Sequence, residues 1–186
     1  ESEIEEIVTE ESTSLGTQGT IGIQVEADEL STWNLTFDYN GFNEEAKGIA
    51  IDSNNNVYVV GEANVDDGAA DYDWWIKKIN SSGDEVVTGW NKTFDGGANG
   101  EDAANAIAID PNNDSAIYVA GGADALWWLK KFDDSGTEDT TNWNFTVGSD
   151  GWIKDIGVNS LGKVVVVGTE DLGANGFDFI GIIYEP

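Results

Sequence analysis

The chain has 186 residues, of which 40% are hydrophobic and 11% aromatic, so it is long enough to fold around one core and too apolar to be disordered. Its 36 acidic residues face only eight lysines, and the net charge of −28 excludes nucleic acid and anionic membrane surfaces as partners. Cys, His and Arg are absent, which excludes thiolate nucleophiles, His-based triads, ordinary zinc or copper sites and disulfide bonds, and no apolar run approaches the ~20 residues of a membrane-spanning helix.

The chain begins with an acidic segment, residues 1–32, which has nine carboxylates and no basic residue before Leu30. Such a composition is ordinarily that of a flexible arm, but two short apolar runs in it predict strands. We expect these strands either to add to the open edge of a neighbouring copy, giving a head-to-tail polymer, or to close against the chain's own sheets. The residues that would pair are Ile4, Ile7, Val8, Ile21, Ile23 and Val25.

Three copies of one repeat come after this segment. The motif Trp33-Asn-Leu-Thr-Phe37 returns at Trp90 and at Trp143, at intervals of 57 and 53 residues. In every copy three further apolar runs come next, separated by Gly, Asn, Asp and Ser. We place the copies at residues 33–89, 90–142 and 143–186.

The four runs of each copy predict a four-stranded antiparallel meander. Runs such as Val57–Val60 and Val164–Val167 are apolar at consecutive positions, and neighbouring strand residues point to opposite faces of a sheet. Both faces of each small sheet must therefore be covered, which favours sheets stacked face to face. The paired tryptophans, Trp74-Trp75 and Trp127-Trp128, fit this interpretation, because the two members of a pair would pack into different layers.

The repeat resembles the bacterial and archaeal β-propeller repeat family called SBBP. The resemblance rests on the pattern A-x-x-I-A-[IV]-D-x-x-x-N-[IV]-Y-V-x-G, a D-x-[FW]-[IV]-x-K-[LI] strand, a Ser-Gly turn and W-x-x-[TS]-[FY]. It implies four-stranded propeller blades in an exported protein, with the Trp-x-x-Thr run as the outer strand of a blade. Residues 46–61, 73–83 and 90–94 match closely, residues 104–136 nearly as well, and residues 143–184 with losses.

The number of blades departs from the family, because propellers usually close with four to eight blades and only three inner-strand sets are present here. Three arrangements are open: a small ring whose fourth blade is the N-terminal segment, a fragment of a larger ring, or an open module completed by a neighbouring subunit. The predicted fold class is therefore an all-β, β-propeller-like array of about three to four four-stranded antiparallel blades.

Five Asn-x-Ser/Thr sequons predict N-glycosylation. Three of them hold one equivalent position in the Trp-Asn-x-Thr motif, where Asn and Thr project from one face of a strand and the aromatic residues from the other. The alternative is that Asn and Thr are simply the solvent-facing side of an edge strand. The candidate acceptors are Asn34, Asn80, Asn91, Asn113 and Asn144.

Two loops have the oxygen spacing that begins a calcium-binding loop. The match ends there, because Val57 stands where such a loop needs Gly and Ala63 where it needs a bidentate Glu. The alternative is an Asx turn between two strands. The candidate calcium ligands are Asp52, Asn54, Asn56, Asp110, Asn112 and Asp114, and a second weak cation site is formed by Asp66, Asp67, Asp71 and Asp73.

Trp152 comes after a Gly-rich stretch and is a better candidate than the paired tryptophans for an exposed aromatic that could bind a sugar.

Two further features bear on enzymatic function. Carboxylate pairs are uninformative in so acidic a chain, and Gly96-Gly97 lacks the Lys-Ser/Thr of a phosphate loop. We therefore expect neither an enzyme nor a resident cofactor, with calcium as the one candidate ion.

The expected function is structural. A chain that starts at Glu1 and contains no Met is expected to have lost a signal peptide, and hence to be secreted or held at the cell surface. The open strand edges predict a subunit of an extracellular filament or surface assembly whose partner is itself. The alternative is a carbohydrate- or surface-binding propeller that uses exposed aromatics and loop carboxylates with calcium.

Overall fold

The computed structural model describes residues 35–38, 41–65, 71–97, 100–147, 150–171, 173 and 176–184. The chain divides into two units, residues 1–32 and 33–186, and all of the described residues belong to the second unit. The strands predicted in the first unit lie outside the described residues, as do Asn34, Asp66 and Asp67; the residues of those strands are Ile4, Ile7, Val8, Ile21, Ile23 and Val25.

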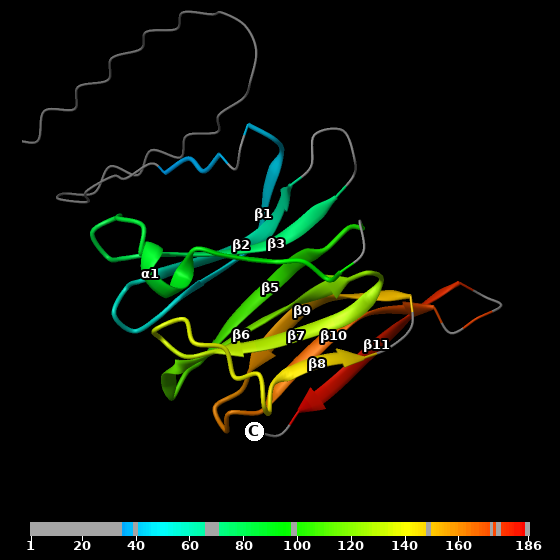
Figure 1. Ribbon diagram of the computed structural model, residues 1–186. Coiled ribbons are helices and arrows are strands. Elements are labelled where there is room, and N and C mark those ends of the chain that lie inside the picture. The colour runs from blue at the N-terminus through cyan, green and yellow to red at the C-terminus, as the bar shows by residue number, and fades with distance from the viewer. Residues whose placement is uncertain are drawn as a thin grey trace, which may run out of the picture. The chain divides into compact units, whose positions relative to one another are not determined.

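The described residues form three antiparallel sheets, which we call the first, second and third blade (Figure 1). The first blade consists of β1 (Glu44–Ile51), β2 (Val57–Asn64), β3 (Tyr72–Ile79) and β4 (Lys92–Phe94), in that order. The second consists of β5 (Ala103–Asp110), β6 (Asn113–Ala123), β7 (Leu126–Phe132) and β8 (Asn144–Val147), in that order. The third has the order β11-β10-β9, with β9 (Gly151–Val158), β10 (Val164–Asp171) and β11 (Phe177–Tyr184). The predicted all-β, propeller-like architecture is confirmed, and the sheets do not close into a ring.

Each of the first two blades takes its outer strand from the beginning of the next repeat. β4 comes after Trp90 and β8 after Trp143, the residues that open the second and third copies. One short helix, α1 (Val87–Trp90), precedes β4, and none of the described helices is long and apolar enough to cross a membrane. The third blade has three strands among the described residues, so β11 is an edge strand there.

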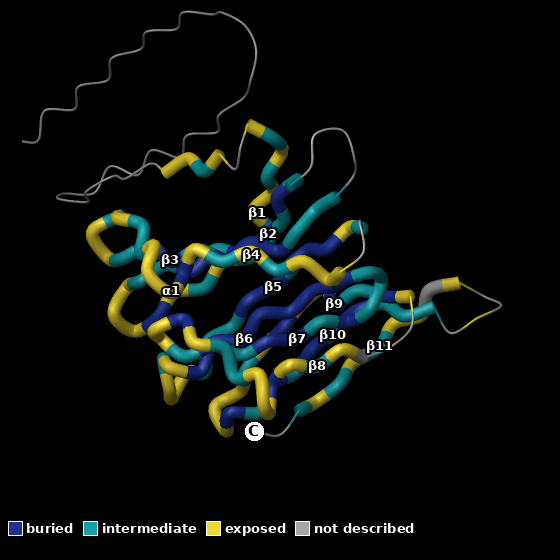
Figure 2. The backbone as a smooth tube through the Cα atoms, in the orientation of Figure 1, coloured by how far each residue is buried: buried dark blue, intermediate teal, exposed yellow. Residues whose placement is uncertain are grey.

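The second blade lies between the first and the third (Figure 1). We call the face of a blade that looks toward the preceding blade in the chain its front, and the opposite face its back. One core fills the space behind the first blade and another the space behind the second, and both are visible as buried segments in Figure 2. The first core contains Tyr58, Val60, Trp74, Ile76, Trp90, Ala104, Ile107, Ile117, Val119 and Phe132. The second contains Ala106, Ala116, Tyr118, Ala120, Trp127, Leu129, Trp143, Ile153, Ile156, Val164 and Val166.

The paired tryptophans divide between the layers as predicted. Trp127 belongs to the core behind the second blade, whereas Trp128 packs against the core in front of it. Trp74 belongs to the first core, and its indole N–H donates a hydrogen bond to the carbonyl oxygen of Gly122 in the second blade at 2.8 Å. Its neighbour Trp75 points to the front of the first blade, where the described residues include no further sheet.

A glycine in the second strand of each of the first two blades allows the first strand to come close. A Cβ atom added at Gly121 would lie 1.9 Å from the carbonyl oxygen of Ala103, and one at Gly61 would lie 1.9 Å from that of Glu45. Each carbonyl lies beside a register shift in the first strand of its blade, between Ala104 and Ala106 in the second. The bulge and the glycine therefore belong together, since the bulged backbone occupies the space of a side chain.

We expect Gly121→Ala to destabilise the fold, because its Cβ would overlap the Ala103 backbone. The free energy of unfolding, measured by urea denaturation at constant salt, should fall by at least about 1–3 kcal/mol. Gly157→Ala is the matched control in β9, because nothing lies within 4 Å of a Cβ added there. It should change the stability by less than about 0.5 kcal/mol. Equal effects of the two substitutions would contradict the close approach.

Candidate functional site

The front of the first blade is an apolar face that no other described sheet covers. Ile49 and Ile51 there are 65% and 61% exposed. The repeat places Ile107 and Ile156 at the position of Ile49 in the second and third blades, and each of them is only 8% exposed because a preceding blade covers it. The exposure of Ile49 therefore marks a surface that has the residue pattern of a contact between blades.

The back of the third blade is uncovered in the same way. Phe179 is 78% exposed and Ile183 is 64% exposed. The residues at the position of Phe179 in the first two blades are Trp74 and Trp127, which are 0% and 2% exposed because a following blade covers them. The described stack thus ends in two unlike apolar faces, a front at one end and a back at the other.

A groove of about 410 Å³ runs along the front of the first blade. One side is formed by Leu35, Thr36 and Phe37, and the floor is formed by side chains of β1, β2 and β3 such as Ile49 and Val59. Most of the lining residues are apolar, so the groove suits another apolar sheet better than it suits a charged ligand.

Phe37 holds its segment against this face. The centroid of its ring lies 6.2 Å from that of Trp75, and the Lys77 ammonium lies 4.4 Å from the centre of the Phe37 ring. Lys77 also pairs with Glu85 at 2.7 Å and donates a hydrogen bond to the Asn91 side-chain oxygen at 2.9 Å. The cation is therefore fixed over the ring, where a cation–π contact stabilises the arrangement by about 0.5–1 kcal/mol.

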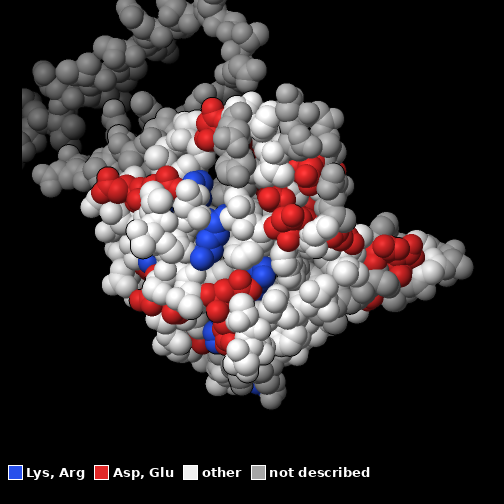
Figure 3. Space-filling view, in the orientation of Figure 1, with Lys and Arg blue, Asp and Glu red and all other residues white. Residues whose placement is uncertain are grey.

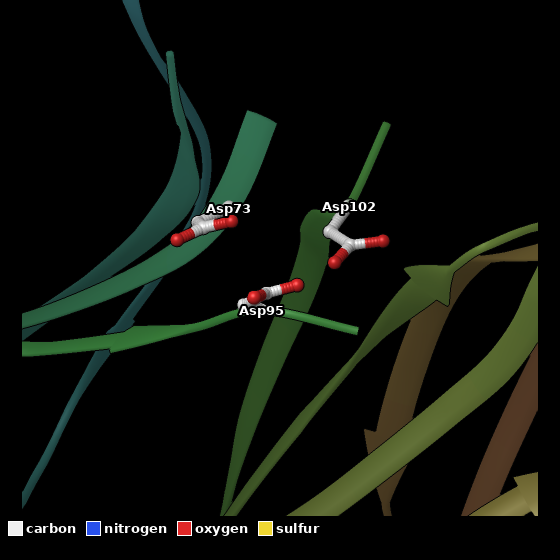
Figure 4. A group of neighbouring side chains, drawn as sticks. All are labelled: Asp73, Asp95 and Asp102. Atoms are coloured by element: carbon white, nitrogen blue, oxygen red, sulfur yellow. The ribbon is translucent and has the colours of Figure 1, made fainter. Parts of the chain in front are cut away.

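Three carboxylates gather where the first and second blades meet. Asp73 lies on β3, Asp95 comes after β4 and Asp102 precedes β5, and Figure 4 shows the three side chains coming together from separate backbone segments. One carboxylate oxygen of each residue lies within 4.8 Å of a carboxylate oxygen of each of the other two. Asp102 is buried and accepts hydrogen bonds from the backbone N–H groups of Gly96 and Asp124, the latter at 2.9 Å.

The electrostatics of this aspartate group are unfavourable to three negative charges. Burial raises the pKa of Asp73 to about 6, and repulsion from Asp95, Asp71 and Asp102 adds to the shift. Burial also raises the pKa of Asp102, although the hydrogen bonds from Gly96 and Asp124 oppose it. Carboxylate oxygens are the ligands that Ca²⁺ prefers, so these three residues could hold a hard cation. The sequence singled out only Asp73 of the three, because Asp95 and Asp102 lie in the second copy and belong to no local motif.

The raised pKa of Asp73 predicts a pH-dependent penalty on the fold. Between the ordinary value of 3.8 and about 6 the folded chain holds a proton that the unfolded chain has released, so stability falls as the pH rises through this window. Asp73→Asn should therefore raise the melting temperature near neutral pH and lose this advantage below pH 3.8. Asp178→Asn, which removes one exposed carboxylate from β11, is the control for net charge. An equal gain in both variants would contradict the assignment.

The carboxylate of Asp52, the first predicted calcium ligand, is occupied by protein donors. Its Oδ1 accepts the backbone N–H groups of Asn54 and Asn56, both at 2.9 Å, and its Oδ2 accepts the Asn56 side-chain amide at 2.7 Å and the Tyr58 hydroxyl at 3.1 Å. Burial raises the pKa of Asp52, but these hydrogen bonds outweigh it, and the pKa lies below its ordinary value. The geometry is that of an Asx turn, and calcium binding by this loop stays a prediction.

The second predicted calcium loop connects neighbouring blades. Asp110 accepts the backbone N–H of Asn112 at 2.9 Å, while the Asn112 amide reaches the carbonyl oxygen of Ser160 in the third blade at 3.0 Å. The Asp114 carboxylate accepts hydrogen bonds from the hydroxyl and the backbone N–H of Ser53 in the first blade. Side chains in these turns therefore tie the three blades together at one edge of the stack.

The described sequon residues differ in their contacts. Asn91 and Asn144 are exposed, and their side-chain oxygens accept hydrogen bonds from Lys77 at 2.9 Å and Lys130 at 3.4 Å. The amide of Asn80 donates to the Asp84 carboxylate at 3.2 Å, and the exposed Asn113 accepts the backbone N–H of Ser115 at 3.1 Å. Glycosylation of these residues stays a prediction.

Trp152 is not the exposed aromatic that its Gly-rich approach suggests. Its side chain is half-buried, and a Cβ added at Gly122 in the second blade would lie 2.4 Å from its ring. The missing side chain at Gly122 therefore makes room for the indole. Among the described aromatic residues, Phe179 is the exposed one.

The described residues include few basic groups, and several of these are paired with acids. Besides Lys77, Lys130 pairs with Glu138 at 2.7 Å and Lys47 with Glu62 at 3.3 Å. Figure 3 shows basic patches near the middle of one face, with acidic patches beside them. Because the whole chain carries a net charge of −28, two copies repel each other at long range unless salt or bound cations screen the charge.

Comparison with known proteins supports the fold and is silent on activity. A family model described as "SBBP: Beta-propeller repeat" matches residues 45–69, which include β2 and all of β1 except its first residue, Glu44. No curated protein matches the chain. The resemblance of the repeat to this propeller family is thus confirmed over residues 45–69.

Proposed function

We propose that this chain is a non-catalytic, secreted structural protein, the subunit of an extracellular filament or cell-surface assembly in which copies bind each other through their blades. The observation that carries the proposal is the pair of uncovered faces, one with exposed Ile49 and Ile51 and the other with exposed Phe179 and Ile183. Large exposed apolar faces mark interaction surfaces, and unlike faces at opposite ends join copies head to tail, which builds a filament where the rotation between copies does not close into a ring.

The energetics favour an assembly that depends on concentration and salt. Burying one large apolar side chain contributes about 1.5–3 kcal/mol, so the four exposed residues together contribute at most about 6–12 kcal/mol. Association itself costs about 4–15 kcal/mol in lost freedom of motion. The net affinity is therefore modest, and screening of the negative charge should strengthen it.

The extracellular setting is supported by the sequence. Five sequons provide acceptors for glycans that would suit a surface protein, and the acidic composition keeps unassembled copies soluble. The open edge of β11 adds a second element to the interface, since an unpaired strand offers its backbone groups to a further strand.

A second candidate function is a carbohydrate- or surface-binding propeller module that depends on calcium. The group of Asp73, Asp95 and Asp102 favours it, because three converging carboxylates match the preference of Ca²⁺ for oxygen ligands. A glycan array probed with and without calcium tests this function. Calcium-dependent binding by a protein that stays monomeric would favour it over the structural proposal.

Substitution of one residue on either face tests the structural proposal. We expect the purified chain to form larger particles as concentration and salt rise, measured by sedimentation velocity. Ile49→Ser and Phe179→Ser should each weaken association about 10- to 100-fold, because each removes one buried apolar side chain from the interface. Leu161→Ser is the matched control, since Leu161 is 77% exposed but lies in the turn between β9 and β10. A chain that stays monomeric in all conditions would contradict the proposal.

A further inference from the structure

The Trp-Asn-x-Thr motifs are offset by one blade along the chain. The three Trp-Asn-x-Thr motifs begin at residues 33, 90 and 143, and the second and third of them lead into β4 and β8. The first motif contains Leu35–Phe37, which is not a strand and is not part of the first blade, whose order is β1-β2-β3-β4. The described chain therefore has one outer-strand motif without a blade and one blade without an outer strand.

Phe37 repeats a contact that Phe94 makes inside the stack. Phe94 belongs to the outer strand of the first blade and reaches the front of the second, where its ring centroid lies 6.3 Å from Trp128 and 4.6 Å from the Lys130 ammonium. The equivalent distances from Phe37 to Trp75 and Lys77 are 6.2 Å and 4.4 Å.

The two lysine ammonium groups also form equivalent ion pairs with acidic side chains. Lys130 pairs with Glu138 at 2.7 Å, and Lys77 pairs with Glu85 at the same distance. Leu35–Phe37 thus stands where the outer strand of a blade in front of the first blade would stand. The groove between this segment and β1–β3 is the space that the inner strands of that blade would fill.

Resting on the proposed self-assembly, we propose that the third blade of a second copy occupies this groove, with Leu35–Phe37 as its missing fourth strand beside β11. The chain's own third blade does not fill it, because the second blade lies between the first and the third. The back of the third blade and the front of the first then meet as the backs and fronts of consecutive blades do within the chain. The joint is heterologous and leaves a free groove at one end and a free third blade at the other, so successive joints build an open chain where the rotation between copies does not close and a ring of copies where it does.

The blades within the chain define the register of this joint. Leu129 of β7 lies opposite Phe145 of β8, and Ile76 of β3 lies opposite Lys92 of β4. The equivalent residues at the joint are Gly181 in β11 of the second copy and Leu35 of the first copy. The proposed joint therefore predicts one residue pair that can be tested directly: Gly181 of one copy lies opposite Leu35 of the other.

The hydrogen bonds of the tryptophans are consistent with this joint. Trp74 donates to the carbonyl oxygen of Gly122 at 2.8 Å and Trp127 to that of Thr169 at 3.0 Å, each in the following blade. The equivalent carbonyl in the first blade is that of Glu62, which accepts the indole N–H of Trp75 at 2.7 Å. The residue that would approach it from the third blade is Phe179, which has no donor to satisfy.

On the third blade, Asp155 is the side chain that should weaken the joint. It stands at the position of Gly48 and Ala106, and Gly48 lies so close to the second blade that an added Cβ would be 3.1 Å from the Ala106 Cα. A carboxylate there must leave water when two copies meet. We therefore expect Asp155→Ala to strengthen association at least tenfold, measured by sedimentation velocity at constant salt, and a weaker association in this variant would overturn the joint.

Cross-linking between two singly substituted full-length chains tests the register. The chain contains no cysteine, so Leu35→Cys in one copy and Gly181→Cys in a mass-tagged second copy provide one thiol each. A Cβ at Gly181 makes only ordinary contacts, the nearest at 3.7 Å from Val167 Cγ1, so the substitution should be tolerated. Mild oxidation should give the mixed dimer. Ile183→Cys, two residues along the same exposed face, is the out-of-register control and should give at least tenfold less.

The outcomes separate the joint from the proposed function. Selective formation of the mixed dimer through positions 35 and 181 supports both. Assembly of the wild-type chain with no preference for position 181 over 183 overturns the joint and leaves self-assembly standing. A doubly substituted Leu35→Cys, Gly181→Cys chain that links only to itself in dilute solution, while the mixed chains do not link, overturns the joint in favour of ring closure. A wild-type chain that never assembles overturns both.

Discussion

The structure depends on one constraint: its central strands are apolar on both sides, so a blade buries its apolar side chains completely only when it has a neighbour on each face. Val60 and Val166 are fully buried, and Trp127 and Trp128 turn into separate layers on either side of one sheet. A sheet that is apolar on both faces but covered on only one leaves about half of its apolar area in water. Stacking removes this cost at every face except the first and the last. We attribute the proposed self-assembly to those two faces, because among the described blades they are the apolar faces that no neighbouring blade covers.

Charge is arranged so that it does not interfere with this stacking. Lys130 is only 3% exposed, yet it pairs with Glu138 and lies over the rings of Trp128 and Phe94, so that its ammonium is compensated on several sides. Among the described acids, Asp52 and Asp133 lie in turns, where their carboxylates accept backbone N–H groups. The aspartate group around Asp102 is the exception, since its carboxylates repel one another where the blades meet.

Much of the fold could be predicted from the sequence, because its main signals are local. The repeat of Trp-Asn-x-Thr and the doubled tryptophans indicate blades that are covered on both faces, and each signal lies within a few residues. The groove and the aspartate group could not be found in this way, since Phe37 meets Trp75 and Asp73 meets Asp102 only after separate strands have packed. At Asp52 the residues of an Asx turn and those of a calcium loop are the same, so spacing alone cannot separate them.

The passage of the chain from one blade into the next has a mechanical consequence. β4 is hydrogen-bonded to β3 of the first blade, yet it is continuous with the chain that enters β5 of the second, and β8 connects the second and third blades in the same way. A pulling force on the chain would act at the start of β3 and at the end of β4, which lie side by side because Trp74 pairs with Phe94, so it would open their hydrogen bonds one after another from that end. A force that draws two blades fully apart must therefore break the backbone hydrogen bonds of an outer strand as well as the apolar contact between the blades.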